Sequence, residues 1–199
     1  MEDNDIICDR ILHIRTTGRD DSESDLTNFP YEPTPYKVLE RLVESNYIEK
    51  KNNLLDFGCG KGRVDFYLAY YLKCHTIGIE LSKILYDRAI SNKENAISGN
   101  RCEFINSNAK DYIIKDNIDR FYFFNPFSLD ILKIVIKRIE ESYKRNKRNI
   151  ILFFYYPSKQ YISYLDNKKN IELIDTITTG DLFILNDNRE KILVYEIKE

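Results

Sequence analysis

The clearest indication of the fold in this sequence is the segment Leu54-Leu55-Asp56-Phe57-Gly58-Cys59-Gly60-Lys61-Gly62-Arg63. A short apolar run ends in an aspartate, three glycines follow at alternate positions, and a helix-like stretch runs from residue 64 to residue 73. This order predicts a strand, a tight loop and a helix. Glycine lets the backbone turn sharply and a ligand come close, and the start of a helix offers free N–H groups and a positive dipole end. The stretch therefore predicts a site for a carboxylate or phosphate ligand.

The spacing of the glycines separates two classes of nucleotide ligand. A dinucleotide loop has the pattern G-x-G-x-x-G, but here the third glycine comes one residue early and Arg63 takes its place. The pattern D-x-G-x-G-x-G resembles motif I of the class I S-adenosylmethionine-dependent methyltransferases. In that family the aspartate organises the loop and helps to hold the methionine amino group. The cofactor-binding positions that the resemblance implies here are Asp56, Gly58, Cys59, Gly60 and Gly62.

The next two predicted strands end in further residues that fit this resemblance. The strand at 75–80 ends in Glu80, and a carboxylate at that distance from the loop can accept both ribose hydroxyls. The strand at 101–106 is followed by Asn108 and Ala109, where the family often has Asp-Ala and the acid bonds the adenine amino group. An asparagine carbonyl can still accept from that amine, and Asp111 is the alternative acid.

The predicted strand at 120–124 runs into Asn125-Pro126-Phe127. These three residues resemble motif IV of amino-group methyltransferases, Asn-Pro-Pro-Tyr/Phe, with one proline missing. There the Asn carbonyl accepts a hydrogen bond from the target nitrogen and the aromatic ring packs on the plane of the target. The resemblance implies that Asn125, Pro126 and Phe127 are the catalytic residues. The alternative is that Pro126 is simply the first residue of the helix that follows.

The segment before the glycine loop has three prolines, at 30, 33 and 35. Prolines favour an extended approach, and Thr34 is expected to cap a helix at about 35–48 whose first residue is Pro35. In several branches of the family such a segment passes under the methionine end of the cofactor, which implies contacts from Thr34 and Tyr36. Residues 1–30 form an acidic arm, in which the stretch 6–14 fits a helix or a strand. The arm is either a lid over the site or a frayed terminus.

The rest of the chain alternates predicted strands and helices. A helix capped by Ser82 extends to about residue 96, an unbroken apolar strand covers 149–155, and residues 171–178 and 191–197 alternate like an antiparallel pair. We expect an α/β fold with a doubly wound, mostly parallel seven-stranded sheet and a terminal antiparallel hairpin, the Rossmann-like fold of the family. A single methyltransferase domain is expected over residues 1–199, with the arm at 1–30 and the core at 31–199.

Composition excludes several classes of protein. The chain of 199 residues is 43% hydrophobic and 13% aromatic, so it is globular, and it contains no run long enough to span a bilayer and no secretory signal. Its four cysteines lie singly, so no zinc site is expected and a cytoplasmic location fits. A net charge of −2 argues against nucleic acid as a partner.

The expected function is S-adenosylmethionine-dependent methyl transfer, with a small molecule or a protein side chain as the acceptor. The scarcity of general bases and the Asn125 carbonyl favour a nitrogen acceptor, although His13 in the arm is a weak candidate base. If the acidic arm closes over the site, a cationic acceptor is favoured. The alternatives are an amino-methyltransferase acting on nucleic acid, a nicotinamide-dependent oxidoreductase, which Arg63 disfavours, and a cofactor-binding protein that does no chemistry.

Overall fold

One sheet carries the fold. The computed structural model describes residues 4–19, 31–184 and 187–199 of the chain. Its strands are β1 (Asn53–Phe57), β2 (His75–Glu80), β3 (Cys102–Asn106), β4 (Arg120–Phe123), β5 (Ile151–Tyr155), β6 (Ile171–Thr178) and β7 (Lys191–Ile197). The described residues form a seven-stranded sheet in the order β3-β2-β1-β4-β5-β7-β6, in which β1 to β5 are parallel and β7 is antiparallel to β5 and β6. The predicted fold class is confirmed.

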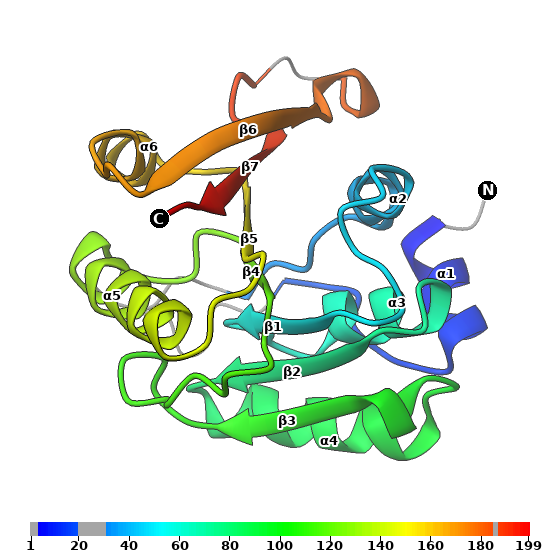
Figure 1. The fold of residues 1–199 in the computed structure, drawn as a ribbon. Helices are drawn as coiled ribbons and strands as arrows, with labels where there is room; N and C mark the ends of the chain where they lie inside the picture. The colour runs from blue at the N-terminus through cyan, green and yellow to red at the C-terminus, as the bar shows by residue number, and fades with distance from the viewer. Residues whose placement is uncertain (1–3, 20–30, 185–186) are drawn as a thin grey trace.

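Helices cover both faces of this sheet (Figure 1). They are α1 (Asn4–Leu12), α2 (Tyr36–Glu44), α3 (Arg63–Tyr71), α4 (Lys83–Asn95), α5 (Leu129–Arg145) and α6 (Lys159–Asp166), with short 3-10 turns at Gly99–Arg101 and Gly180–Leu182. One apolar core lies between the sheet and α1 to α4, and a second lies between the sheet and α5 and α6. Strand β4 shows how the sequence builds both: Phe121 and Phe123 point into the second core, and Tyr122 points into the first.

The register of the parallel strands brings four loops to one edge of the sheet. Phe57 pairs with Ile79 on one side and with Phe123 on the other, and Glu80 pairs with Asn106. Parallel strands end at the same edge, so the loops after β1, β2, β3 and β4 gather there. We call this edge, formed by residues 58–62, 81–82, 107–109 and 124–127, the carboxyl edge.

Two helix starts test the predicted caps. Ser82 does cap α4, because its side-chain oxygen accepts a hydrogen bond from the Leu85 N–H at 3.2 Å. The prediction for Thr34 is wrong. Pro35 occupies the N-cap position of α2, and the Thr34 hydroxyl lies instead 3.0 Å from the Tyr122 hydroxyl. The hydroxyl partner from β4 satisfies Thr34 in the buried first core, so the helix start is left without a side-chain cap.

The arm is described from residue 4 to residue 19. Its apolar stretch, whose type the sequence left open, is helical as far as Leu12, and α1 packs on α2 and α3. Among the described residues, none of the helices combines the length and the apolar character needed to cross a lipid bilayer.

Candidate functional site

The glycine loop after β1 adopts a backbone that other residues rarely enter. Gly58, Gly60 and Gly62 have φ angles of 76°, 56° and 85°. A Cβ built on Gly58 would lie 2.7 Å from Cβ of Pro126, and one on Gly60 would lie 2.2 Å from the ring of Tyr31. Glycine is required here both by the left-handed turns and by these close approaches.

Glu80 joins the glycine loop to the loop after β2. Its Oε2 accepts a hydrogen bond from the Gly60 N–H and its Oε1 accepts one from the Ser82 N–H, each at 2.8 Å. The side chain is only 8% exposed. Each carboxylate oxygen has more than one acceptor position, so Glu80 can hold the loop and still accept from the hydroxyls of a ligand. The structure therefore places Glu80 beside Gly60, as the ribose role requires.

Asn108 and Ala109 follow β3 at the same edge. The Asn108 side-chain oxygen accepts a hydrogen bond from the Lys110 N–H at 3.1 Å, so it also shapes its own turn. Asn106, at the end of β3, donates to the carbonyl oxygens of Glu80 and Leu81, both at 2.9 Å. This contact, which the sequence did not predict, fixes β3 against the loop that carries Glu80.

The three residues after β4 divide between the carboxyl edge and the core. Pro126 lies against Gly58, and Asn125 before it has the left-handed φ of 45°. Phe127 is 5% exposed, and its ring packs at 6.2 Å from the ring of Phe57 in the second core. The structure thus brings Asn125 and Pro126 to the glycine loop and places the Phe127 ring among core side chains.

Asp56 is buried behind the loop, next to a second aspartate. Asp56 is 3% exposed and Asp65, in the first turn of α3, is fully buried. Burial raises the pKa of the Asp56 carboxyl to about 8, and the negative charge of Glu80 adds to the rise. Burial, followed by the neighbouring charge of Asp56, raises the pKa of Asp65 well above its ordinary value.

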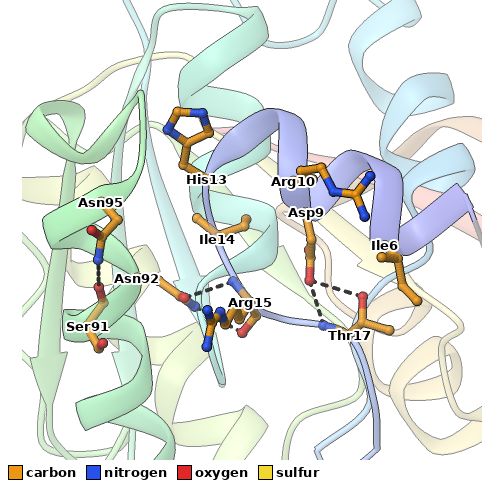
Figure 2. Close-up of a pocket in the computed structure, with 10 residues that line it drawn as sticks. All are labelled: Ile6, Asp9, Arg10, His13, Ile14, Arg15, Thr17, Ser91, Asn92 and Asn95. Atoms are coloured by element: carbon orange, nitrogen blue, oxygen red, sulfur yellow. Dashed lines mark hydrogen bonds between the residues drawn. The ribbon is translucent and has the colours of Figure 1, made fainter.

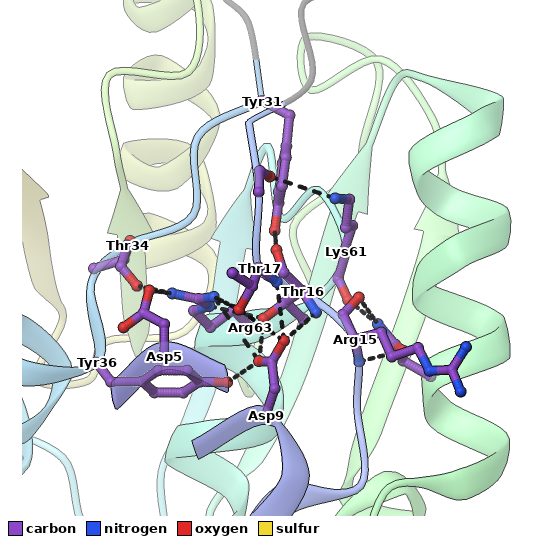
Figure 3. A network of polar contacts seen from close by, with 12 residues as sticks. Asp5, Asp9, Arg15, Thr16, Thr17, Tyr31, Thr34, Tyr36, Lys61 and Arg63 are labelled. Atoms are coloured by element: carbon purple, nitrogen blue, oxygen red, sulfur yellow. Dashed lines mark hydrogen bonds and ion pairs between the residues drawn. The ribbon is translucent and has the colours of Figure 1, made fainter. Parts of the chain in front are cut away.

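Arg63, directly after the glycine loop, is the centre of a buried polar network (Figure 3). Its guanidinium is 2% exposed and lies 4.3 Å from the centre of the Tyr36 ring. It donates to Thr16 Oγ1 at 2.7 Å, to Asp5 Oδ2 at 2.5 Å, to Thr17 Oγ1 at 3.0 Å and to the Thr34 carbonyl at 3.3 Å. Arg63 therefore ties α3 to the arm and to the segment before α2.

Asp9 supplies the negative charge at the centre of this network. Its carboxylate accepts from the N–H and hydroxyl groups of Thr16 and Thr17 at 2.6–3.0 Å, and from the Tyr36 hydroxyl at 2.5 Å. These hydrogen bonds hold the pKa of Asp9 below its usual range, although burial acts in the opposite direction. Tyr36, predicted to contact the cofactor, is thus placed behind the glycine loop, in the network.

Tyr31 covers the middle glycine of the loop. Its ring lies against Gly60, and its hydroxyl donates to the Thr16 carbonyl at 2.8 Å. The Lys61 ammonium lies 4.5 Å from the centre of the ring, which suits a cation–π contact. Cys59, on the other side of the loop, is buried against Gly78, and burial raises the pKa of its thiol well above the ordinary value. Cys59 is therefore a packing residue whose backbone alone can serve a ligand.

An aromatic cluster lies at the ends of β4 and β5. The rings of Phe124 and Tyr155 are 4.6 Å apart, and Tyr156, with a left-handed φ of 49°, follows β5 beside them. The Tyr155 hydroxyl donates to Glu190 at 2.8 Å, which ties this cluster to the end of the terminal hairpin. Because Phe124 precedes Asn125, the cluster flanks the carboxyl edge on the side away from β2.

An open hollow of about 870 Å³ lies between α1 and α4 (Figure 2). Arg10, His13 and Arg15 face it from the arm, and Ser91 and Asn95 face it from α4. The predicted cofactor-binding residues and the predicted catalytic residues Asn125, Pro126 and Phe127 do not line it, whereas the candidate base His13 does. The hollow is therefore separate from the carboxyl edge, and His13 belongs to the hollow.

Sequence reasoning missed Asp65, Arg63 as the anchor of the arm, and Tyr31. Asp65 carried a detectable signal, since a charged residue stands on the inward face of an otherwise apolar helix. The acids of α1 were visible as well, but nothing in the chain indicates that Asp5 and Asp9 face a buried arginine far away in the sequence.

The residues fit the cofactor that the resemblance implies. Three glycines give the loop after β1 its left-handed turns, Glu80 bonds the N–H of the middle one, and a buried carboxyl stands behind the loop at Asp56. Within residues 4–19, 31–184 and 187–199, no three His, Cys, Asp or Glu side chains are close enough together to hold a metal ion.

No protein-family model matches the chain, and no curated protein matches it in sequence. Among solved structures it is similar to an RNA methyltransferase from Salinibacter ruber in complex with S-adenosyl-L-homocysteine, with 16% identity over 84% of this chain and 95% of that chain and a TM-score of 0.57. It is also similar to a TehB-like SAM-dependent methyltransferase from Corynebacterium glutamicum, with 16% identity over 81% of this chain and 88% of that chain and a TM-score of 0.56. A third similar structure is the [4+2]-cyclase SpnF, with 15% identity over 81% of this chain and 80% of that chain and a TM-score of 0.62. The chain therefore has the fold of the class I S-adenosylmethionine-dependent methyltransferases.

Proposed function

We propose that this protein transfers the methyl group of S-adenosylmethionine to a nitrogen atom of a small molecule or a protein side chain. The observation that carries the proposal is the contact of Pro126 with Gly58. It puts Asn125, a hydrogen-bonding side chain at the end of β4, next to the loop whose three glycines suit the cofactor. A cofactor loop and a candidate acceptor-binding residue then share one edge of the sheet.

The predicted site residues at and beside the carboxyl edge have distinct parts in this proposal. The glycine backbone and Asp56 bind the methionine end, Glu80 accepts from the ribose hydroxyls, and Asn108 accepts from the adenine amino group. The bound sulfonium supplies an activated methyl group, so the protein's main task is to place the nucleophile in line with it. The carbonyl of the Asn125 side chain orients the nitrogen by accepting its N–H. The Phe127 ring, packed in the core, positions Pro126 and Asn125 through the backbone.

The positions of the histidines favour nitrogen over oxygen as the acceptor. An oxygen nucleophile usually needs a general base, and histidine is the commonest one. The sequence has two histidines. His75 begins β2, at the end of the strand opposite the carboxyl edge, and His13 lines the hollow between α1 and α4. A neutral amine needs less help, because its lone pair attacks directly and its proton leaves during or after the transfer.

Replacing Asn125 by alanine tests the role of this residue. We expect turnover to fall by about 100-fold or more, a loss of about 3 kcal/mol of transition-state stabilisation, while the Kd for S-adenosylhomocysteine changes by less than about threefold. The assay is transfer of the labelled methyl group into fractionated cell extract, followed by calorimetric titration of the product cofactor. Asn46→Ala is the matched control, because Asn46 also has a left-handed φ, of 61°, and it lies between α2 and the start of β1, whereas the glycine loop follows the end of β1. Equal losses of turnover and cofactor affinity in Asn125→Ala contradict the proposed role.

Two other functions remain as alternatives. SpnF shows that this fold can serve a cyclase, so a cofactor-binding protein that does not transfer methyl groups is the second candidate; it predicts binding of S-adenosylhomocysteine without label transfer. A nucleic-acid acceptor is the third, since one structural neighbour is an RNA methyltransferase. Retention of labelled RNA or DNA in a gel-shift assay at physiological salt would support it, against the net charge of −2.

A further inference from the structure

Two buried carboxyl groups face each other beneath the glycine loop. Asp56 belongs to β1 and Asp65 to the first turn of α3, and they are 3% and 0% exposed. Neither oxygen of Asp65 has a hydrogen-bond donor among the described residues, and the buried hydroxyl of Thr76 close by has no partner there either. A carboxylate accepts hydrogen bonds and donates none. Two ionised carboxylates would therefore interact with each other while the Asp65 oxygens lack a hydrogen-bond donor.

The surroundings make that doubly ionised state still less favourable. Neither aspartate forms an ion pair with a described residue. Glu80 of β2 acts on Asp56, and the two aspartates in turn act on the other titratable groups around them: Tyr122 of β4, Cys59 of the glycine loop, Cys74 just before β2 and Cys102 at the start of β3. None of these groups is a cation. In a buried site, two like charges without a counter-charge repel strongly, and the pair keeps a proton instead.

We propose that Asp56 and Asp65 share one proton in the cofactor-free protein, and that this proton is released to solvent when the ammonium group of the cofactor's amino-acid end binds at Asp56. The inference rests on the proposed cofactor site. The bound ammonium supplies the missing positive charge, so the proton is no longer needed and the pair ionises. Asp65 is then a positioning residue, since it acts on the ligand only through Asp56.

The arrangement also selects a class of ligand. A ligand that carries an ammonium group replaces the shared proton and gains binding free energy from its ion pair with Asp56. A nucleotide without an ammonium group leaves the pair protonated and gains no binding free energy from the two aspartates. This separates the amino-acid end of S-adenosylmethionine from the ends of a nicotinamide dinucleotide. The coupling of the two aspartates would thus add discrimination to a loop whose glycines alone suit several nucleotides.

Isothermal titration with S-adenosylhomocysteine, which keeps the ammonium group, tests the inference. Titrations at about pH 7 in two buffers of different ionisation enthalpy give the number of protons released, and we expect about one. The Kd should also tighten by about tenfold per pH unit over the range in which the pair holds its proton. This pH series needs only the natural chain.

Asp65→Asn is the diagnostic variant, because an amide can donate to the Asp56 carboxylate and keep it ionised. We expect binding without proton release and with a flat pH dependence, while Asp130→Asn, at an exposed aspartate in the first turn of α5, behaves like the natural chain. Binding with no proton release in the natural chain would overturn the inference and leave the proposed function intact, as would unchanged release in Asp65→Asn. Failure of S-adenosylhomocysteine to bind at all would overturn the proposed function itself.

Discussion

Gly60 is constrained by its own backbone, by Tyr31 and by Glu80. Its φ of 56° suits glycine, its N–H donates to Glu80, and the Tyr31 ring occupies the space where a side chain would begin. Gly18 in the arm has a φ of 97°, and no atom lies within 4 Å of the position that a Cβ would take there. Alanine at Gly18 would strain the backbone alone, whereas alanine at Gly60 would strain the backbone and also clash with Tyr31. Comparing the two substitutions therefore separates the two contributions to the free energy of unfolding.

We predict that Gly60→Ala destabilises the protein by more than Gly18→Ala. Gly18→Ala should cost about 1–2 kcal/mol, the penalty for a left-handed residue with a Cβ. Gly60→Ala bears the same strain and must also displace Tyr31, and it should weaken binding of S-adenosylhomocysteine. Urea denaturation of both variants and of the double variant Tyr31→Ala/Gly60→Ala measures the difference. If the excess cost of Gly60→Ala is unchanged when Tyr31 is truncated, the contact is not its cause.

Single residues differ in how far their roles could be predicted from the sequence. The glycines and Glu80 were predictable because they are close in the chain and each acts through backbone geometry that the pattern specifies. The charge of Asp65 in an apolar helix is visible in the sequence, but its role is not, because that role comes from its interaction with Asp56 across the packed interface of β1 and α3. Thr34 was assigned to a cap for the same reason: its partner, Tyr122, is distant in the sequence and visible only after folding.

The element with the least typical sequence is α1. It turns Asp5 and Asp9 toward Arg63 and leaves Ile6, Ile7 and Ile11 from 38% to 47% exposed. Most helices bury their apolar residues and expose their charged ones, but α1 does the reverse for several residues. The sequence therefore did not distinguish a helix from a strand here. The strands were predictable to within a few residues, because buried parallel strands are recognisable as apolar runs.

We predict that Arg63→Ala releases the arm while the sheet stays folded. Removing one partner of a buried ion pair costs about 3–5 kcal/mol, and here Asp9 would remain buried without its counter-charge. Because α1 packs on α2 and α3 and is not part of the sheet, undocking it relieves that cost. Hydrogen exchange read by mass spectrometry should show loss of protection over residues 4–17 and unchanged protection in β1, β4 and β5.

Arg41→Ala is the matched control for this experiment. Arg41 pairs with Asp181 at 2.6 Å, but both side chains are exposed, and exposed pairs contribute about 1 kcal/mol or less. Its exchange pattern should match that of the natural chain. Retained protection of α1 in Arg63→Ala would mean that apolar packing, and not the Arg63 network, holds the arm.

For the molecule as a whole, the fold follows from two features that are visible in the sequence. Strands alternate with helices along most of the chain, and an antiparallel pair of strands comes last. The site was harder to predict, because it depends on which loops the strand order brings together. Placing β1 between β2 and β4 makes the glycine loop the neighbour of both Glu80 and Asn125. The same strand order buries Asp56 at the centre of the sheet. Burial of this carboxyl group affects the free energy of unfolding of the whole chain.

We predict that the free energy of unfolding falls as the pH rises from about 5 to about 8. In the unfolded chain an aspartate loses its proton near pH 4, whereas the pKa of Asp56 in the folded protein is raised to about 8. Between these values the folded state holds more protons than the unfolded state, so stability is fully present below the lower pKa and is lost as the pH rises through the upper one. The slope approaches about 1.4 kcal/mol per pH unit for each proton held.

Asp65→Asn should flatten this dependence, because the amide donates to Asp56 and lets it ionise in the folded state. The gain in stability over the natural chain should therefore grow as the pH rises, and it should be smallest near pH 5. Urea unfolding followed by circular dichroism at several pH values gives the comparison without any ligand. Asp130→Asn, at an exposed aspartate of α5, provides the reference for surface charge. A gain that does not change with pH would assign the stabilisation to packing, and it would remove the shared proton from the account of this site.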